Sequence, residues 1–215
     1  MEIALLSLPL LASITSGFFG KYIGDRNSEI VTSLFVSTSA LLSLIIFYQV
    51  IVNGYENNVV IATWINSGTL DVNWSIKVDP LSSVMLVVIT LVSSLVHIYS
   101  IGYMSHDPHK SRFMAYLSLF TFAMLTLVTS DNFLQLFFGW EGVGLCSYFL
   151  IGFWFKKDSA NAAAIKAFVV NRVGDFGFAL GIFLIFYLFG TVNYSEVFQQ
   201  IPQIIDKELL FLGIH

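Results

Sequence analysis

Four residues with charged side chains lie inside long apolar stretches in the second half of this sequence: Glu141, Lys166, Arg172 and Asp175. A charged side chain at the centre of a membrane costs about 2.5–3.5 kcal/mol on insertion scales. Such a side chain therefore needs an ion-pair partner, a water-filled cavity or a function. Because proton relays in membranes are built from groups of this kind, these four residues are the candidates for moving protons.

Glu141 lies roughly 12 Å along its predicted helix from the outer boundary, at 1.5 Å per residue, which is near mid-depth. Gly144, Tyr148 and Gly152 follow it at helical spacing, so one face carries a carboxylate, a phenol and two glycines that another helix can approach closely. A carboxylate beside a cation that moves can bind and release a proton near neutral pH. The alternative is a permanent ion pair that fixes helix packing.

Arg172 and Asp175 are three residues apart and can form an ion pair within one helix. Their spacing fits a neutralised pair at a helix interface about as well as a role in gating. Lys166 lies nine positions before Asp175 and thus on nearly the opposite face. It either extends towards the inner surface or, if it points into the bundle, holds a proton as a desolvated amine.

Of the four histidines, one lies in a predicted span, two lie in a loop outside the apolar runs, and His215 is the last residue. His97 could relay protons, but a histidine with satisfied hydrogen bonds is the favoured interpretation. His106 and His109 are expected in a solvated loop rather than at a metal. With no phosphate-binding glycine loop in the sequence, we expect neither a metal nor a cofactor site on this chain.

Transmembrane helices must position these residues. The chain is 56% hydrophobic and 11% charged, with a mean hydropathy of +0.79, an apolar excess that lipid must solvate. About 20 helical residues cross the hydrocarbon layer. The sequence therefore predicts an all-α polytopic membrane protein with about six spans and the start of a seventh at Leu209. The six apolar runs cover residues 3–19, 30–52, 81–103, 113–130, 133–155 and 160–189.

The long segment between the second and third runs predicts a small extramembrane β-hairpin at residues 53–80. Residues 59–64 and 72–76 read as strands around a turn at 66–68, and Pro80 can open the third helix. Cationic residues concentrate in the loops after spans one, three and five, which predicts that those loops face inward and that the N-terminus and the hairpin face outward. These cations are Lys21, Arg26, Lys110, Arg112, Lys156 and Lys157.

Composition excludes several classes of protein. No basic stretch could follow a phosphate backbone, so nucleic acid is not an expected partner. The single cysteine, Cys146, excludes an internal disulfide framework and a cysteine-ligated cluster on this chain. The N-terminus has no basic leader, so the first apolar run is expected to remain in the mature protein.

Four motif runs together resemble one known family. They are residues 97–104, 112–117, 131–144 and 171–177, with the strings Trp-Glu-Gly-Val-Gly at 140–144 and Arg-Val-Gly-Asp at 172–175. They are similar to subunit 5 of NADH dehydrogenase, an antiporter-like membrane subunit of respiratory complex I. The resemblance covers most of the chain from about residue 81 to 189, and the first two spans match more loosely.

The resemblance implies that Glu141 is a proton-translocating glutamate, paired in the family with a lysine on a broken seventh helix. It also implies that Arg172 and Asp175 lie near the neighbouring antiporter-like subunit 4. On this basis residues 1–112 hold helices one to three with the outer hairpin, and residues 113–215 begin an incomplete antiporter-like repeat. Family members are longer, so we expect a second polypeptide, or the remainder of a longer product, to supply the partner lysine.

The resemblance further implies a subunit of a proton-translocating NADH:ubiquinone reductase that has no redox site of its own. FMN, iron–sulfur clusters and ubiquinone are expected on other subunits, and the lipid bilayer and the other complex I membrane subunits are the expected partners. The expected location is the mitochondrial inner membrane, with a bacterial inner membrane as the alternative. Two other functions stay open: a structural or assembly subunit, and a subunit of a multi-subunit sodium/proton antiporter.

Overall fold

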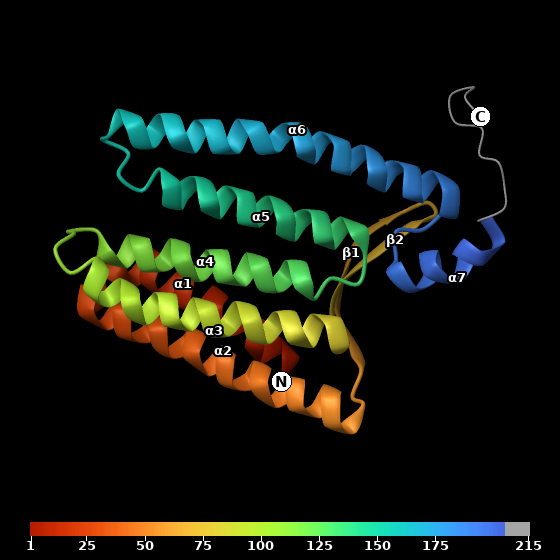
Figure 1. Cartoon of the computed structure of the whole chain (residues 1–215), viewed down its shortest axis with the longest axis horizontal. Helices are drawn as coiled ribbons and strands as arrows, with labels where there is room; N and C mark the ends of the chain where they lie inside the picture. Colours follow the sequence, from red (N-terminus) through yellow and green to blue (C-terminus); the bar gives the residue numbers. More distant parts are fainter. Residues whose placement is uncertain (205–215) are drawn as a thin grey trace.

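The computed structural model describes residues 1–204, and the predicted seventh span at Leu209 lies outside them. Helices and strands follow one another as two helices, a β-hairpin and five further helices (Figure 1). Their bounds are α1 Glu2–Ile23, α2 Asp25–Asn53, β1 Asn57–Ser67, β2 Leu70–Val78, α3 Pro80–Tyr103, α4 Lys110–Val128, α5 Phe133–Ile151, α6 Asp158–Phe189 and α7 Tyr194–Ile204.

Helices α1 to α6 are long and apolar enough to cross a membrane, which confirms the six predicted spans. The largest difference is at α2, which begins at Asp25 rather than at residue 30. A single residue, Gly24, joins α1 to α2 and has φ +86°, a conformation that side-chain-bearing residues rarely adopt. The glycine lets the chain reverse direction at once, so α2 starts five residues earlier than the apolar run.

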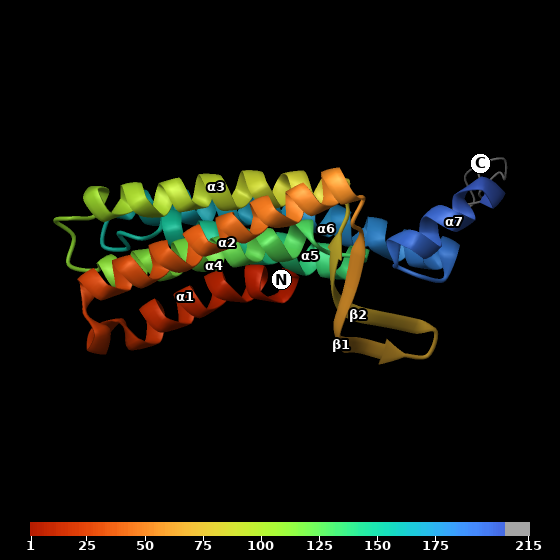
Figure 2. The same ribbon diagram turned by 90° about the horizontal axis from the view of Figure 1, so that it is seen from below.

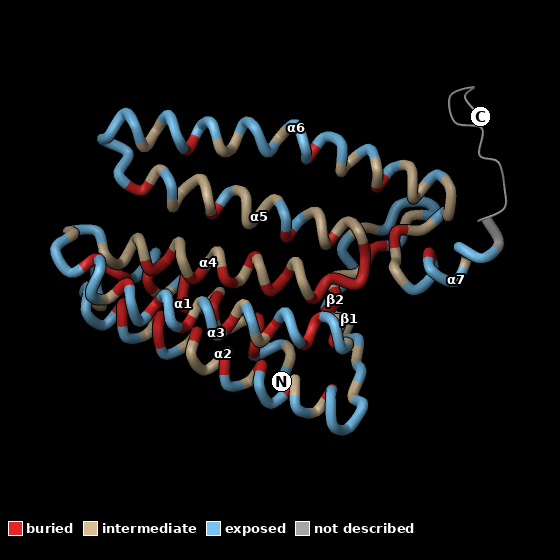
Figure 3. Tube along the Cα trace, viewed as in Figure 1, coloured by how far each residue is buried: buried red, intermediate tan, exposed pale blue. Residues whose placement is uncertain are grey.

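The helices run up and down side by side, with α4 near the centre (Figure 1). Helix α4 contacts α1, α2 and α3 as well as α5, and α6 packs against α5. Burial differs sharply across this arrangement: 39% of the spanning stretch of α1 is buried, against 11% of that of α6. In Figure 3 the buried positions concentrate in α1 to α4, whereas most of α6 is exposed. The molecule is a tight four-helix group with a two-helix edge, α5 and α6.

Strands β1 and β2 form the predicted antiparallel hairpin, which projects from one end of the helices (Figure 2). Ser67 pairs with Leu70, so the turn is Gly68-Thr69, and Gly68 has the positive φ that such turns need. After the hairpin, α3 begins at Pro80 as predicted. The Asp79 carboxylate accepts a hydrogen bond from the Ser82 backbone N–H at 2.7 Å, and Ser82 Oγ accepts one from the Asp79 N–H at 2.8 Å.

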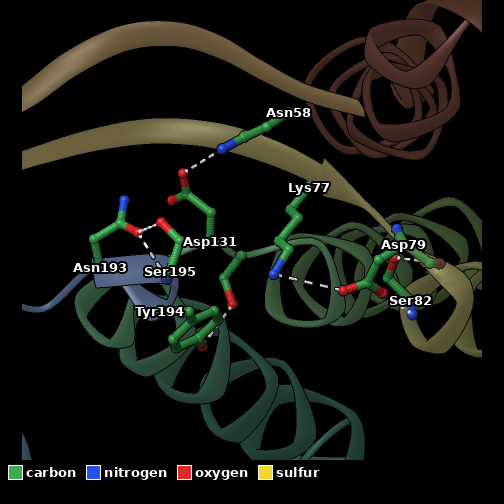
Figure 4. A network of polar contacts seen from close by, with 9 residues as sticks. Asn58, Lys77, Asp79, Ser82, Asp131, Asn193, Tyr194 and Ser195 are labelled. Atoms are coloured by element: carbon green, nitrogen blue, oxygen red, sulfur yellow. Dashed lines mark hydrogen bonds and ion pairs between the residues drawn. The ribbon is translucent and has the colours of Figure 1, made fainter. Parts of the chain in front are cut away.

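A polar network holds the hairpin and α7 against the start of α5 (Figure 4). Asp131, in the α4–α5 connection, is buried and accepts a hydrogen bond from Asn58 Nδ2 at 2.9 Å. The Asp131 backbone oxygen accepts a further bond from the Tyr194 N–H. Gln135 of α5 exchanges two hydrogen bonds with the backbone of Ser75 in β2. Helix α7 was not predicted because it is short and amphipathic, without an apolar run.

Candidate functional site

Two glycines set how α5 meets α4. A Cβ on Gly139 would lie 2.7 Å from the backbone N and Cα of Leu127, and one on Gly142 would lie 3.1 Å from Ala123 Cβ. Only glycine permits so close an approach of the two backbones. Because Glu141 is more than a quarter turn away from both glycines around the helix, this packing directs it away from α4. It meets α6 instead.

Glu141 and Asp175 share one cation, Arg172. Arg172 Nη1 donates to Glu141 Oε2 across the α5–α6 interface, and the same nitrogen lies 3.2 Å from Asp175 Oδ2 within α6. The indole Nε1 of Trp140 donates to Asp175 Oδ1 at 2.8 Å. The guanidinium also lies 4.2 Å from the ring centroid of Phe168. These contacts leave the group with two carboxylates for one cation.

Burial within this group is uneven. Asp175 is 7% exposed, whereas the side chains of Glu141 and Arg172 are 25% and 39% exposed. Glu141 Oε1 is nevertheless buried and has no hydrogen-bond partner among the residues that the structure describes. One oxygen of this carboxylate is therefore fixed by Arg172, and the other is available to a proton or a further donor.

The structure contains the expected contact between Arg172 and Asp175, and it adds one that the sequence did not indicate, between Arg172 and Glu141. The glycines predicted on the Glu141 face behave differently from each other. A Cβ on Gly152 would lie 3.2 Å from Ala164 Cβ of α6, but Gly144 faces open space within residues 1–204. Tyr148 packs against Phe168, with ring centroids 5.4 Å apart.

Lys166 is not part of this group. It lies on the exposed side of α6, almost opposite the buried Asp175, and has no ion-pair or hydrogen-bond partner within residues 1–204. The described chain therefore does not bring together all four of the residues selected from the sequence. Glu141, Arg172 and Asp175 meet, and Lys166 faces away.

The histidines lie apart from the charged group. His97 is fully buried, with both ring nitrogens in hydrogen bonds, so the prediction of a satisfied histidine is confirmed. His109 precedes α4, and its N–H donates to Asp107 Oδ1 at 2.8 Å. Burial raises the pKa of Asp107, but hydrogen bonds from the Trp154 indole and the His109 N–H outweigh it and lower the pKa. Within residues 1–204 no three His, Cys, Asp or Glu side chains gather where they could hold a metal.

Trp140 and Phe168 were not predicted as neighbours of the charged side chains. Trp140 carried a usable signal, because an indole N–H in an apolar environment needs an acceptor and Trp140 stands beside Glu141. Its acceptor is Asp175, so the indole helps to fix the carboxylate that shares Arg172. Phe168 had no such signal, since it lies one helical turn before Arg172 among other aromatic and aliphatic residues.

Two family models match the chain. The model of the chain 5 N-terminus of NADH-ubiquinone oxidoreductase (complex I) matches residues 64–114, and the transmembrane model of NADH:quinone oxidoreductase/Mrp antiporter matches residues 130–215. NADH-ubiquinone oxidoreductase chain 5 of Chondrus crispus is 52% identical over 213 residues, which are 99% of this chain and 32% of the relative. The chain belongs to the complex I chain 5 family. The resemblance drawn from the motifs is thereby confirmed.

Further members of the chain 5 family agree. Chain 5 of Triticum aestivum is 57% identical over 92% of this chain and 30% of the relative. NADH-quinone oxidoreductase subunit L of Rickettsia bellii is 50% identical over 98% of this chain and 33% of the relative. The chain spans about a third of the length of the curated relatives it matches.

Solved structures show the same fold at low identity. The membrane-bound sulfane sulfur reductase, an archaeal respiratory membrane complex, has a chain with a TM-score of 0.78 at 20% identity, covering 92% of this chain and 39% of that chain. A chain of the Mrp complex from Dietzia sp. DQ12-45-1b has a TM-score of 0.76 at 21% identity, covering 91% of this chain and 20% of that chain. Both support the antiporter-like arrangement of helices.

Proposed function

We propose that this chain forms the N-terminal part of the antiporter-like subunit 5 of respiratory complex I, and that Glu141 takes part in proton translocation. The observation that carries the proposal is the shared cation: Arg172 contacts Glu141 and Asp175 at once, while Glu141 Oε1 is buried and unpartnered within residues 1–204. The proton affinity of a carboxylate held in this way changes strongly when its cation moves.

The arrangement suggests how a charge change could move a proton. When Arg172 contacts Glu141, the guanidinium balances the negative charge of the carboxylate, and Glu141 remains deprotonated. When Arg172 contacts Asp175 alone, Glu141 is left in an apolar setting and takes up a proton. The return of Arg172 releases that proton. The Trp140 indole donates a hydrogen bond to Asp175, which holds this second partner of the guanidinium in place.

The driving charge change comes from elsewhere in the complex. FMN, iron–sulfur clusters and ubiquinone belong to other subunits, and the whole assembly acts as a proton-translocating NADH:ubiquinone reductase. The partners of this chain are the other complex I membrane subunits, especially antiporter-like subunit 4, the lipid bilayer and the polypeptide that supplies the rest of subunit 5. The membrane is the mitochondrial inner membrane, or a bacterial inner membrane.

Lys166 has a separate role in the proposal. It faces away from Glu141, so it does not act on that carboxylate directly. An amine on the exposed side of α6 can receive a proton from, or pass one to, the part of the subunit that packs there. We therefore place Lys166 on the continuing path and not in the Arg172 group.

A structural role is the competing function, and one observation favours it: Arg172 already joins α5 to α6 by an ion pair. Buried pairs of this kind can exist only to fix helix packing. In that case Glu141 matters for assembly and not for proton transfer, and the two functions predict different results for the same variant.

The test is Glu141→Gln in the intact complex, measured for assembled complex and for protons pumped per NADH oxidised. Glutamine keeps the size and can still accept a hydrogen bond from Arg172, so we expect normal assembly and strongly lowered pumping. Glu141→Asp is the matched control, since it keeps a carboxylate and should retain part of the pumping. Poor assembly, with normal pumping by the complexes that do assemble, would establish the structural role instead.

A further inference from the structure

Pairs of hydroxyl side chains join α2 and α3 inside the four-helix group. Ser37 Oγ of α2 lies 2.8 Å from Ser94 Oγ of α3, and Ser43 Oγ lies 2.7 Å from Thr90 Oγ1. Each hydroxyl can both donate and accept a hydrogen bond. These pairs by themselves explain helix packing, but α3 also carries a buried base.

That base is His97 of α3, which is fully buried. Its Nδ1 lies 2.7 Å from the backbone oxygen of Ser93, and its Nε2 lies 3.0 Å from Ser118 Oγ of α4. A carbonyl oxygen can only accept, so Nδ1 carries the proton and Nε2 presents its lone pair to the Ser118 hydroxyl. His97 is thus held as a neutral tautomer with its basic nitrogen directed at α4.

Two buried polar side chains of α2, Glu29 and Ser33, have oxygen atoms that make no hydrogen bond within residues 1–204. Glu29 is 6% exposed and Ser33 is 8% exposed, and neither Glu29 Oε1 nor Ser33 Oγ has a hydrogen-bond partner within residues 1–204. Glu29, Ser33 and Ser37 follow at four-residue spacing and so share one face of α2. Because Ser37 meets Ser94 in the antiparallel pair, Ser33 lies near the depth of His97. Buried polar groups without protein partners are ordinarily satisfied by water.

The two ends of this polar path differ. At one end Lys110 Nζ lies 3.9 Å from Glu29 Oε1, and its side chain is 22% exposed, so the path reaches the loops that are predicted to face inward. At the hairpin end an apolar cluster fills the space between the helices and the hairpin. Its buried members are Leu5, Leu6, Ile46, Val50, Ile76, Val78, Leu86 and Leu125. The polar residues thus end at the partly exposed Lys110 on one side, and an apolar cluster lies on the other.

We propose that α2, α3 and α4 enclose a water-filled proton well that begins at Glu29 and Lys110 and ends at His97. It is a proton-binding site distinct from the Glu141 group on α5 and α6. Its ligand is a short chain of water molecules that carries an excess proton. Because the apolar cluster closes the hairpin end, the well binds protons from the inner side and does not conduct them across the membrane.

The proton step balances through Ser118. An excess proton on a water molecule moves to Ser118 Oγ as the hydroxyl proton of Ser118 moves to His97 Nε2, which leaves neutral water, a neutral hydroxyl and an imidazolium. The Ser93 carbonyl continues to accept from Nδ1–H, so the histidine need not rotate. The ionisable groups around Glu29 are Lys110 of α4 and, on α2, Asp25 and Arg26.

The first test measures water along the path by cysteine labelling in the intact complex, in membrane vesicles of either orientation. The variants Ser33→Cys and Val36→Cys are made in a Cys146→Ser background, and a small water-soluble thiosulfonate is added from one side at a time. Val36 is the matched control because it is fully buried and lies less than one turn from Ser33 on α2. A thiol in water forms the reactive thiolate far more readily than one in an apolar core, so we expect labelling at residue 33 to be about tenfold faster than at residue 36, from the inner side only.

The second test asks whether the well ends at His97. A cysteine in place of Ser118 would stand next to Nε2, and an imidazolium beside it keeps the thiolate populated at lower pH. We expect the labelling rate of Ser118→Cys to fall off at a lower pH than that of Ser33→Cys. Adding His97→Gln should return the pH profile of residue 118 to that of residue 33.

Each result decides the proposal. Equal labelling rates at residues 33 and 36 would show that the path is dry and would overturn it. Labelling of residue 33 from the outer side at the same rate would show that the hairpin end is not closed. An unreactive cysteine at residue 118, or a pH profile that His97→Gln leaves unchanged, would remove His97 as the end of the well. None of these readouts depends on proton pumping by Glu141, so they are independent of the proposed function.

Discussion

The α1–α4 group and the α5–α6 edge use polar residues in opposite ways. In α1–α4 most buried polar groups are neutral hydroxyls bonded to each other or to backbone oxygens, such as Ser43 with Thr90. On the edge, Glu141, Arg172 and Asp175 form a charged group with an unpartnered oxygen, on helices that the described chain covers poorly. Neutral hydroxyl pairs stabilise a single packing of the helices, whereas a cation shared by two carboxylates permits more than one arrangement of similar energy. The first region is suited to rigidity and the second to a change of state.

The largest effect should follow from Arg172→Met, which removes the cation that Glu141 and Asp175 share. Two carboxylates would then face each other in apolar surroundings. We expect a loss of roughly 2–3 kcal/mol, less than for a fully buried pair because Arg172 is 39% exposed, with much less assembled complex and impaired pumping. Native electrophoresis and proton-pumping assays measure both. Arg172→Lys keeps the charge, so its assembly and pumping should be intermediate between those of Arg172→Met and the wild type. Full activity of Arg172→Met would show that the shared cation is dispensable.

A somewhat smaller effect is expected where the two regions meet. Gly139→Ala puts a Cβ 2.7 Å from the Leu127 backbone, so α5 must move away from α4 at a cost of about 1–3 kcal/mol. The thermal midpoint of the complex should fall. Gly144→Ala is the matched control on the same helix, since its Cβ meets open space within residues 1–204. Equal midpoints for the two variants would mean that the α4–α5 contact is looser than the structure indicates.

Within α1–α4, Ser43→Ala should affect stability and nothing else. It removes one partner of a buried hydroxyl pair, which costs on the order of 1 kcal/mol and lowers the thermal midpoint slightly. Protons pumped per NADH should not change, because the pair is neutral and distant from the edge group along the fold. A changed number of protons pumped per NADH in this variant would contradict the assignment of a purely structural role to the hydroxyl pairs of α1–α4.

The smallest effect is expected at the start of α3. Asp79→Ala removes the capping box and should cost about 1 kcal/mol or less in stability. Burial raises the pKa of Asp79, but bonds from Ser82 and the charge of Lys77 lower it overall. Since the folded pKa lies below the unfolded one, the stabilisation is present at neutral pH and is lost as the pH falls through the folded pKa. Thermal midpoints of the two proteins should therefore converge in acid; a constant difference would assign the cost to the lost side chain alone.

The sequence allowed the architecture to be predicted well, because each element had its own local signal. Six apolar runs predicted six spans, and the alternation on either side of Gly68 predicted the hairpin. The contact between Glu141 and Arg172 had no local signal. It depends on how α5 is rotated between α4 and α6, which Gly139 and Gly142 decide through close packing with α4. Lys166 does not join the group for a different reason: it lies nine residues before Asp175 and therefore on the opposite, exposed face of α6.

The most direct test compares two carboxylates on spanning helices, one from each region, by the number of protons pumped per NADH oxidised. Glu29 is in the α1–α4 group and Glu141 is on the α5–α6 edge. Glu29→Gln and Glu141→Gln each remove one ionisable group from a spanning helix. We expect an unchanged ratio for Glu29→Gln, because the proposed well has no outlet, and a strongly lowered ratio for Glu141→Gln. A normal ratio for Glu141→Gln in a fully assembled complex would contradict this expectation.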